Sequence, residues 1–222
     1  MPAIEPELEA LKDNLQDMLS MVKKQMEKCL KAIEEKDTSL AKQVVDDEKK
    51  INIQELAIDR DCENILALHT PVATDLRMVL ASLKITNDLE RIGDSAKALA
   101  KFLSKDLNKN EYKWMEELKF PSMLEILISM LKEMGNAMRK EDTKSALKAV
   151  KNDDDLNDYF KKAVKTTEEL ILKNPDDAKT LLTLFLLIRN LERAGDLTKN
   201  IAEEIVFQIE ARVVKHKGLR KL

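Results

Sequence analysis

The sequence predicts an all-α protein of six long helices, a tandem duplication of a three-helix antiparallel bundle. Composition is the first reason, because only 4 of the 222 residues are glycine and 5 are proline, while 36% are charged and 44% hydrophobic. Straight-chain residues such as Leu, Lys and Glu lose little side-chain freedom in a helix, so such a composition is typical of long helices. The second reason is that the two halves of the chain align with each other over helix caps, breaks and an acidic motif, which indicates a duplication.

Start and stop signals divide the first half into three helices. We expect these helices at about residues 6–36, 38–68 and 71–104. Asp37 is a suitable N-cap for the second helix, and Pro71, after the break His-Thr-Pro, suits the first turn of the third. Short connections make sequential helices antiparallel neighbours, so the first repeat is predicted to be a bundle over residues 1–106.

The second half repeats this pattern after a polar segment. Residues 105–120 carry Tyr112 and Trp114, and we interpret them as a linker. Helices are then expected over about residues 121–140, from a cap at Asp142 to residue 173, and after a break at residues 174–175. Linker and second repeat together form the predicted second unit, residues 107–222.

The alignment of the halves needs no gaps over long stretches. A shift of 105 residues places Asp37 on Asp142, and a shift of 102 places residues 89–94 on residues 191–196. The difference of three residues corresponds to a shorter connection before the last helix. A match that covers caps, breaks and a near-identical stretch of six residues exceeds what a Leu/Lys/Glu-rich composition gives by chance.

The stretch of six residues is the motif Leu-Glu-Arg-x-Gly-Asp. Its acids, Glu90 and Asp94 in the first half and Glu192 and Asp196 in the second, lie four residues apart and therefore on one helix face. Like charges at this spacing destabilise a helix by roughly 0.2–0.5 kcal/mol, and a glycine inside a helix adds about 1 kcal/mol relative to alanine. Both halves carry both costs, and the glycine would let a neighbouring backbone or a ligand approach closely.

Helix geometry predicts which residues stand opposite these acids. The second and third helices reverse near Thr70, so position 92 lies level with about position 48. In the second half the reversal near Asn174 sets position 194 level with about position 154. The oxygen-bearing residues selected in this way are Glu48 and Asn52 in the first half and Asp153 and Asn157 in the second, with Asp47 and Asp154 as less certain additions.

Three carboxylates between two helices need compensating positive charge, and two explanations remain open. One is a solvated patch with salt bridges from nearby basic residues, namely Lys49, Lys50, Arg91 and Arg193. The other is a bound cation. A ligand set made only of oxygen atoms suits hard ions such as Mg, Mn, Ca or ferric iron, and it disfavours copper or a structural zinc.

Catalytic constellations are missing from the sequence, so no catalytic residue is predicted. The two histidines, His69 in a turn and His216 in the tail, cannot build the Glu-x-x-His pairs of di-iron helix bundles. Cys29 and Cys62 are expected to be buried thiols in a reducing cytoplasm. We expect no disulfide between them, because the helix layout separates them by roughly 27 Å, beyond a disulfide's reach of about 7 Å.

Charge and hydropathy narrow the classes of partner. A net charge of −3, with both signs spread along the chain, gives no overall attraction to nucleic acid. The acidic N-terminus lacks a secretory signal, and the longest apolar run falls short of the ~20 residues that a membrane helix needs. The last residues are basic and are interpreted as a frayed terminus: Arg212, Lys215, Lys217, Arg220 and Lys221.

The sequence resembles the PhoU family of phosphate-transport regulators over nearly its whole length. The resemblance rests on D-L-E-R-I-G-D-S-A at residues 88–96, N-L-E-R-A-G-D at 190–196, P-V-A-T-D-L-R at 71–77 and I-N-x-x-E-L-A-I-D at 51–59. It implies two three-helix bundles, metal clusters held at acid-x-x-x-acid motifs, and a homodimer. It also implies a negative regulator of phosphate uptake and phosphate-starvation signalling, an adaptor between the ATP-binding subunit of the phosphate ABC transporter and a sensor histidine kinase. Such an adaptor is cytoplasmic and reaches the inner membrane through its partners.

Carried over by position, the family's metal motifs fall on the pairs that the turn geometry selected. These are Glu48 and Asn52, Glu90 and Asp94, Asp153 and Asn157, and Glu192 and Asp196. The amides Asn52 and Asn157 stand where family motifs can have a second acid. An amide oxygen can ligate a metal but brings no charge, so weaker or fewer ions are expected. The alternative function, from a different class, is a metal-dependent phosphoester hydrolase that uses the same carboxylates.

Overall fold

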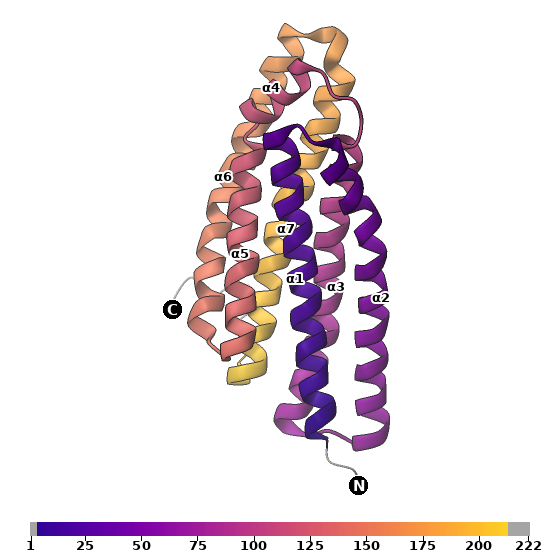
Figure 1. Cartoon of the computed structure of the whole chain (residues 1–222). Helices are drawn as coiled ribbons and strands as arrows, with labels where there is room; N and C mark the ends of the chain where they lie inside the picture. Colours follow the sequence, from indigo (N-terminus) through magenta and orange to yellow (C-terminus); the bar gives the residue numbers. More distant parts are fainter. Residues whose placement is uncertain (1–3, 213–222) are drawn as a thin grey trace.

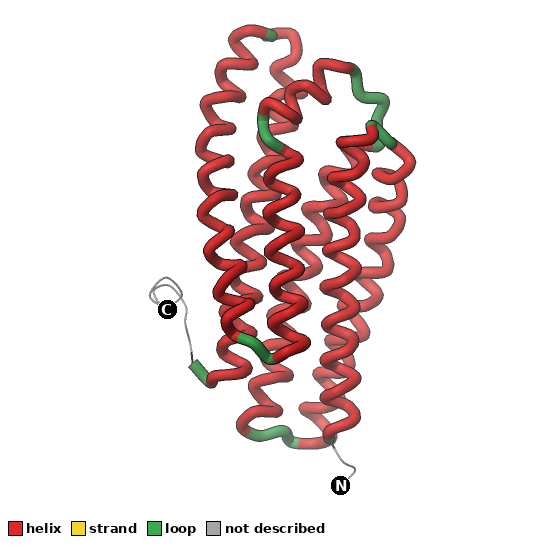
Figure 2. Tube along the Cα trace, turned by 60° about the vertical axis from the view of Figure 1, so that its left-hand side comes forward, coloured by secondary structure: helices red, strands yellow, loops and turns green. Residues whose placement is uncertain are grey.

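The computed structural model describes residues 4–212, without the side chains of residues 149, 151 and 152. Within this range the chain forms six long helices and one short helix, joined by tight turns (Figures 1 and 2). No helix in residues 4–212 is both long and apolar enough to cross a membrane. Several residues of the predicted basic tail lie outside the described range, as does the second histidine: Lys215, His216, Lys217, Arg220 and Lys221.

The first half consists of α1 (Glu5–Glu35), α2 (Thr38–His69) and α3 (Ala73–Leu103), close to the expected bounds. Asp37 caps α2 as predicted, because its side chain accepts hydrogen bonds from two backbone N–H groups of the first turn. The prediction for Pro71 was wrong in detail. The third helix begins two residues later, and Pro71 is a buried residue of the turn that precedes it.

The second half repeats this arrangement. Asp142 caps its second helix through a hydrogen bond from the backbone N–H of Lys144, 3.0 Å from Oδ1. The break before the last helix is a single 3₁₀ turn, which includes Pro175. The elements are α5 (Phe120–Lys140), α6 (Thr143–Lys173), η1 (Pro175–Asp177) and α7 (Ala178–Glu210).

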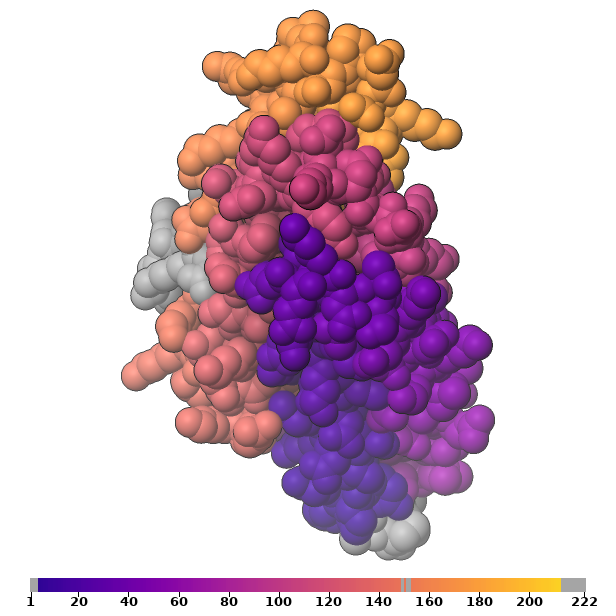
Figure 3. Space-filling model, turned by 45° about the horizontal axis from the view of Figure 1, so that its top comes forward, coloured from indigo at the N-terminus to yellow at the C-terminus, as the bar shows by residue number. Residues whose placement is uncertain are grey.

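The segment interpreted as a linker contains a helix, α4 (Lys109–Glu117). Asn108 and Glu111 form a capping box at its start, which satisfies free N–H groups from both directions. Trp114 and Met115 are buried, so α4 is attached through apolar contacts and is more than a polar connection. It lies near one end of the bundle, and the turn between α6 and α7 projects beyond it (Figure 3).

The two halves lie side by side (Figure 1), where α1 packs on α5 and α3 packs on α7. Buried residues from both halves form one continuous hydrophobic core. Leu89 and Leu191, which open the two acidic motifs, are fully buried in it, so each motif is fixed by its own first residue. The predicted division of the chain at residues 106 and 107 stays a prediction.

The cysteines are unbonded and buried, which confirms the prediction. The Sγ atom of Cys29 lies 3.5 Å from the backbone oxygen of Ala96, and that of Cys62 lies 3.8 Å from the backbone oxygen of Val79. Burial raises the pKa of both thiols to about 12. The thiolate, which is the reactive form, is therefore rare at neutral pH.

Candidate metal centre

The glycine of each acidic motif lies where its helix closely approaches the preceding helix. A Cβ on Gly93 would stand 3.2 Å from Cδ1 of Ile51, and a Cβ on Gly195 would stand 2.5 Å from Cδ1 of Leu156. Any larger side chain would push the helices apart or force Ile51 and Leu156 to move. The atoms that approach the glycines are side-chain atoms, whereas the sequence predicted the approach of a neighbouring backbone or a ligand. The close contact brings the acids of the two helices together.

The first acidic cluster comprises Glu48, Asn52, Glu55, Glu90 and Asp94, on α2 and α3. Glu48 is only 5% exposed. Its Oε1 atom lies 2.7 Å from Nζ of Lys97 and accepts a hydrogen bond from Nδ2 of Asn52 at 2.9 Å. Burial alone would raise the pKa of Glu48, but these two hydrogen bonds and the lysine charge hold it below its ordinary value.

Glu90 has the opposite electrostatic environment. Burial, followed by the charges of Asp94 and Glu55, raises the pKa of Glu90 to about 7. Burial and the charges of Asp59 and Asp94 also raise the pKa of Glu55. The ammonium of Lys97 lies 2.7 Å from Glu48 and 3.9 Å from Asp94, and the charge of Lys101 also acts on Glu48. The raised pKa values of Glu90 and Glu55 indicate that part of the negative charge is still uncompensated.

Asn52 supplies an unpartnered oxygen to the same cluster. Its Nδ2 donates to Glu48, whereas its Oδ1 is buried and has no hydrogen-bond partner among the described residues. A buried carbonyl oxygen without a donor is unfavourable by about 1–3 kcal/mol. Such an oxygen beside carboxylates with raised pKa values is the donor set that a hard cation prefers.

The second acidic cluster comprises Asp153, Asn157, Glu192 and Asp196, on α6 and α7. Asp153 is 3% exposed, and its Oδ2 lies 3.7 Å from Nζ of Lys199 and 3.3 Å from Nδ2 of Asn157. Burial, and then the charge of Asp196, raises the pKa of Asp153.

Glu192 differs from its counterpart Glu90 in having a cation nearby. Burial and the charges of Asp196 and Asp153 raise the pKa of Glu192, while Arg189 partly opposes them. The second cluster is therefore acidic like the first, with its motif glutamate better compensated and its buried acid, Asp153, less well compensated than Glu48.

The PhoU domain family matches residues 15–103, which carry most of α1 and all of α2 and α3, and residues 120–205, which carry α5, α6 and most of α7. The chain belongs to the PhoU family. The PhoU homolog of Borreliella burgdorferi, named a phosphate-specific transport system accessory protein, is 35% identical over 205 residues, covering 90% of this chain and 92% of that protein. PhoU of Escherichia coli (strain K12), which carries the same name, is 28% identical over 212 residues, covering 96% of this chain and 87% of that protein.

Solved PhoU structures have the same fold. The crystal structure of PhoU from Pseudomonas aeruginosa aligns with a TM-score of 0.85 at 28% identity, covering 95% of this chain and 100% of that one. The phosphate transport system regulatory protein PhoU from Streptococcus pneumoniae aligns with a TM-score of 0.78 at 25% identity, covering 96% and 100%. These matches confirm the resemblance inferred from the motifs.

The expected register between facing helices of the PhoU fold was wrong by about one helical turn. Gly93 was expected level with position 47 but contacts Ile51, and Lys97 contacts Glu48. In the second half, a Cβ on Gly195 would meet both Leu156, at 2.5 Å, and Oδ1 of the expected Asp153, at 3.1 Å, while Lys199 contacts Asp153 instead of a residue one turn earlier. The reason is that each turn centre lies one or two residues later than assumed, because α3 begins at residue 73 and α7 at 178.

This shift changes the neighbours of the acids. Glu55, which the sequence analysis did not select, acts on Glu90 more strongly than Glu48 does. The shared face of α2 could have revealed it, since Glu55 lies seven residues after Glu48.

The compensating cations also differ from those expected. Lys97 and Lys199 make the salt bridges of the clusters, and they are counterparts at the shift of 102. The expected cations Lys49, Arg91 and Arg193 make no ion pair with any described residue. Lys50 pairs with Asp47, which also pairs with a lysine of α1. Asp47 therefore belongs to the α1 side of α2, and Asp154 is exposed.

The carboxylates are not gathered into a finished coordination sphere. Among the described residues, no three His, Cys, Asp or Glu side chains stand together as a ready metal-binding group. The donor chemistry nevertheless fits a hard cation, because the first cluster combines an unpartnered amide oxygen with a carboxyl group whose pKa is about 7. A cation would take over the role that the Lys97 ammonium has between Glu48 and Asp94.

Proposed function

We propose that this chain is a negative regulator of phosphate uptake and phosphate-starvation signalling that acts without catalysis. In this role it is an adaptor between the ATP-binding subunit of a phosphate ABC transporter and a sensor histidine kinase. The observation that carries the proposal is that the PhoU match covers both repeats, while relatives matched over most of their length are named phosphate transport accessory proteins. The proposed location is the cytoplasm, at the inner membrane through these partners.

The acidic clusters carry negative charge that partner proteins can detect and that bound cations would change. We propose that Asn52, Glu55, Glu90 and Asp94 hold a hard cation with Glu48, and that Asp153, Asn157, Glu192 and Asp196 hold a weaker one. Mg, Mn, Fe and Ca are the candidates because all ligands are oxygen atoms. Bound cations would neutralise the two acidic faces and thereby change the surface offered to a partner.

Co-purification from native membranes tests the adaptor role. A tagged chain should capture the transporter's ATP-binding subunit and the kinase at high external phosphate, and less of both at low phosphate. Deletion of the gene should switch on phosphate-starvation genes at high phosphate. If neither partner is captured under either condition and the deletion leaves expression unchanged, the proposed role is wrong.

A homodimer is part of the proposal and has its own test. The chain has a mass of 25.4 kDa. Light scattering after size-exclusion chromatography should give about twice this mass, whereas a value equal to one chain at micromolar concentration contradicts the dimer.

The alternative function, a metal-dependent phosphoester hydrolase, is favoured by one observation. A carboxyl group with a pKa of about 7, such as Glu90, is suited to general acid–base catalysis at neutral pH. A bound cation would lower that pKa, however, because positive charge favours the carboxylate. Hydrolysis of p-nitrophenyl phosphate with millimolar Mn decides between the two. A rate that Glu90→Gln abolishes supports the enzyme, and a rate equal to the buffer blank supports the adaptor.

A further inference from the structure

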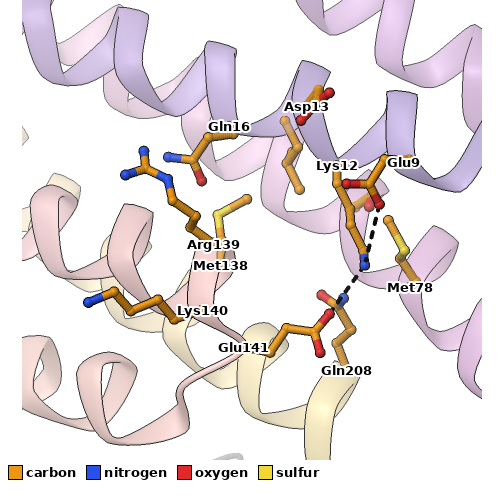
Figure 4. Close-up of a pocket in the computed structure, with 12 residues that line it drawn as sticks. Glu9, Lys12, Asp13, Gln16, Met78, Met138, Arg139, Lys140, Glu141 and Gln208 are labelled. Carbon is orange, nitrogen blue, oxygen red and sulfur yellow. Dashed lines mark hydrogen bonds and ion pairs between the residues drawn. The ribbon is translucent and has the colours of Figure 1, made fainter.

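Among the cavities of the molecule, two at the α1 helix differ in how their charges are balanced. The larger, about 370 Å³, lies between the halves and is lined by residues of α1, α3, α5 and α7 (Figure 4). Lys12 in this cavity lies 3.2 Å from Glu141 and 4.0 Å from Glu9, so its charge is already compensated by the lining. The smaller cavity, between α1 and α2, has an excess of positive charge.

The smaller cavity has a volume of about 280 Å³. It is lined by four residues of α1 and three of α2: Met21, Lys24, Gln25, Lys28, Asp47, Lys50 and Ile51. The spacing of these residues, at three or four along each helix, places each set on one helix face. Three lysines stand against one aspartate, so the lining carries a net charge of about +2 at neutral pH.

Asp47 orients two of the three lysines. Its Oδ2 lies 2.6 Å from Nζ of Lys28, and its Oδ1 lies 2.7 Å from Nζ of Lys50. Each ammonium has three N–H donors and spends one on Asp47, so two donors remain on each. Lys24, the third lysine, forms no ion pair with any described residue and keeps all of its donors available.

The duplicated half shows that the fold does not require this charge. Its counterparts at the shift of 105 are Ser129 for Lys24, Glu133 for Lys28 and Asp155 for Lys50. Glu133 is itself paired, 2.7 Å from Lys148. The same helix pair is therefore basic in one half and acidic in the other. Packing alone does not explain three lysines at this place.

We propose that the cavity between α1 and α2 binds a small oxyanion of the phosphate type, inorganic phosphate or the phosphate group of a small metabolite. Lysine binds phosphate as a point charge, and three of them here supply donors from both helices. The volume lies below the roughly 300–1,000 Å³ of sites that enclose drug-sized ligands, so it suits one or two phosphate groups. The apolar side chains of Met21 and Ile51 line the same cavity and lower the local dielectric, which strengthens charge attraction. This inference is independent of the proposed regulatory role and of any bound metal.

Calorimetric titration of the full chain with sodium phosphate, in chelator and at low ionic strength, tests the site. The chelator removes metal ions, so phosphate that binds through a metal ion does not contribute to the measured binding. The wild type should show saturable binding of one phosphate per chain. Lys24→Gln together with Lys28→Gln should weaken this binding at least tenfold, while Asp47→Asn should strengthen it several-fold because a competing anion is removed.

The matched control is Lys161→Gln together with Lys165→Gln, which removes the same charge from two exposed lysines four apart on α6. This control should leave phosphate binding unchanged, and circular dichroism should show that both double variants remain folded. Titrations with pyrophosphate, a sugar phosphate and sulfate identify which oxyanion the cavity binds most tightly. Tighter binding of free phosphate assigns the site to the ion, and tighter binding of a phosphorylated compound assigns it to a metabolite. Equal loss of binding in both double variants, or no binding by the wild type, overturns the proposal.

Discussion

The two acidic clusters occupy equivalent places in the two halves, and they differ in what surrounds the shared motif. In the first half, Glu55 and Asp59 continue the acidic face of α2. Their counterparts in α6 are Phe160 and Val164, and Phe160 stacks on Phe185 with ring centroids 5.8 Å apart. One half thus adds carboxylates beside the motif, while the other half adds an apolar contact.

This difference shows in the electrostatics of the equivalent glutamates. Glu90 has three carboxylates nearby and a pKa of about 7, whereas Glu192 has two and the opposing charge of Arg189. The duplication therefore preserved the glycine and the acidic pair, which determine how the helices meet, but distributed the charge unequally. We expect the first cluster to be the stronger cation site. Four experiments test what the two halves share and where they differ.

The first experiment tests the close contact at the motif glycine, which both halves share, and it should change stability most. Gly93→Leu and Gly195→Leu should each lower the free energy of unfolding by about 3 kcal/mol, because a larger side chain overpacks the contact with α2 or α6. Gly195→Leu should cost more, since its Cβ would already meet Leu156 at 2.5 Å, against 3.2 Å from Ile51 for Gly93. Urea unfolding measures both changes.

Leucine has a better helix propensity than glycine, so the control must carry the same side chain at an exposed place. Asn87→Leu in α3 and Asn200→Leu in α7 provide it, and both should leave stability nearly unchanged. A rise in melting temperature for either glycine variant would show that the close approach imposes no constraint.

The second experiment compares the response of the two clusters to cations. Millimolar Mn or Mg should stabilise the wild type by about 2.7 kcal/mol at a hundredfold excess over Kd, since a cation that binds only the folded arrangement shifts the equilibrium toward it. In a chain of this size the melting temperature should rise by roughly 5–10 °C. Glu90→Gln with Asp94→Asn should remove most of this gain, and Glu192→Gln with Asp196→Asn should remove less.

Lys97→Gln should have the opposite effect, because it removes the ammonium that lies between Glu48 and Asp94 and so leaves the acids without its charge. It should destabilise the metal-free protein and increase the gain from Mn. Equal losses from the two double variants would end the ranking of the clusters. A wild type without any metal-dependent shift, together with a first double variant that is less stable in chelator, would favour salt bridges as the role of these acids.

The third experiment uses pH, in chelator. Glu90 has a folded-state pKa of about 7 against an ordinary value of 4.5, so it stays protonated in the folded state while it ionises in the unfolded state. Below pH 4.5 both states are protonated and the group has no effect. The destabilisation grows between pH 4.5 and 7 and is complete above 7. Because the side chain is partly exposed, we discount the penalty to about 1–2 kcal/mol for solvent screening.

The measurement is urea unfolding of wild type and Glu90→Gln at pH 5, 6, 7 and 8. The difference between them should grow with pH in favour of the variant, and Glu192→Gln should show a smaller trend of the same sign. A difference that is independent of pH would mean that Glu90 has an ordinary pKa.

The smallest change in stability is expected at the C-terminal ends of two equivalent helices, one in each half. Lys36 after α1 and Glu141 after α5 have left-handed backbone with φ of 55° and 50°, a conformation that costs non-glycine residues about 1–2 kcal/mol. Lys36→Gly should stabilise the protein by about 0.5–1 kcal/mol. Glu141→Gly should gain less, because it also loses its ion pair with Lys12. Lys36→Ala, which removes the side chain but keeps the strain, should give no gain in melting temperature.

Much of the fold was predictable because its signals are local. The caps Asp37 and Asp142 and the breaks before α3 and α7 determine where helices start, and short turns then make neighbours antiparallel. The missed helix α4 also had a local signal, the capping box of Asn108 and Glu111, but its polar composition suggested a linker.

The candidate site was less predictable because it depends on register between helices. An error of one or two residues at a turn centre moves the facing residue by about one helical turn. This was enough to select Glu48 in place of Glu55 as the main neighbour of Glu90 and to miss Lys97 and Lys199. Helix-end geometry and tilt decide that register, and neither can be read from spacing alone.

The junction between the halves has a consequence for the history of the chain. Each helix there meets its own counterpart, α1 on α5 and α3 on α7. Interfaces with twofold rotational symmetry, such as those in dimers of identical subunits, are formed by surfaces that are complementary to themselves. The chain therefore resembles such a dimer whose two subunits were fused into one polypeptide. In a dimer of identical subunits every substitution appears twice, but after fusion each copy changes alone. That freedom allows an aromatic pair in one copy where the other has acids, and three lysines beside a cavity of one copy where the other has serine, glutamate and aspartate.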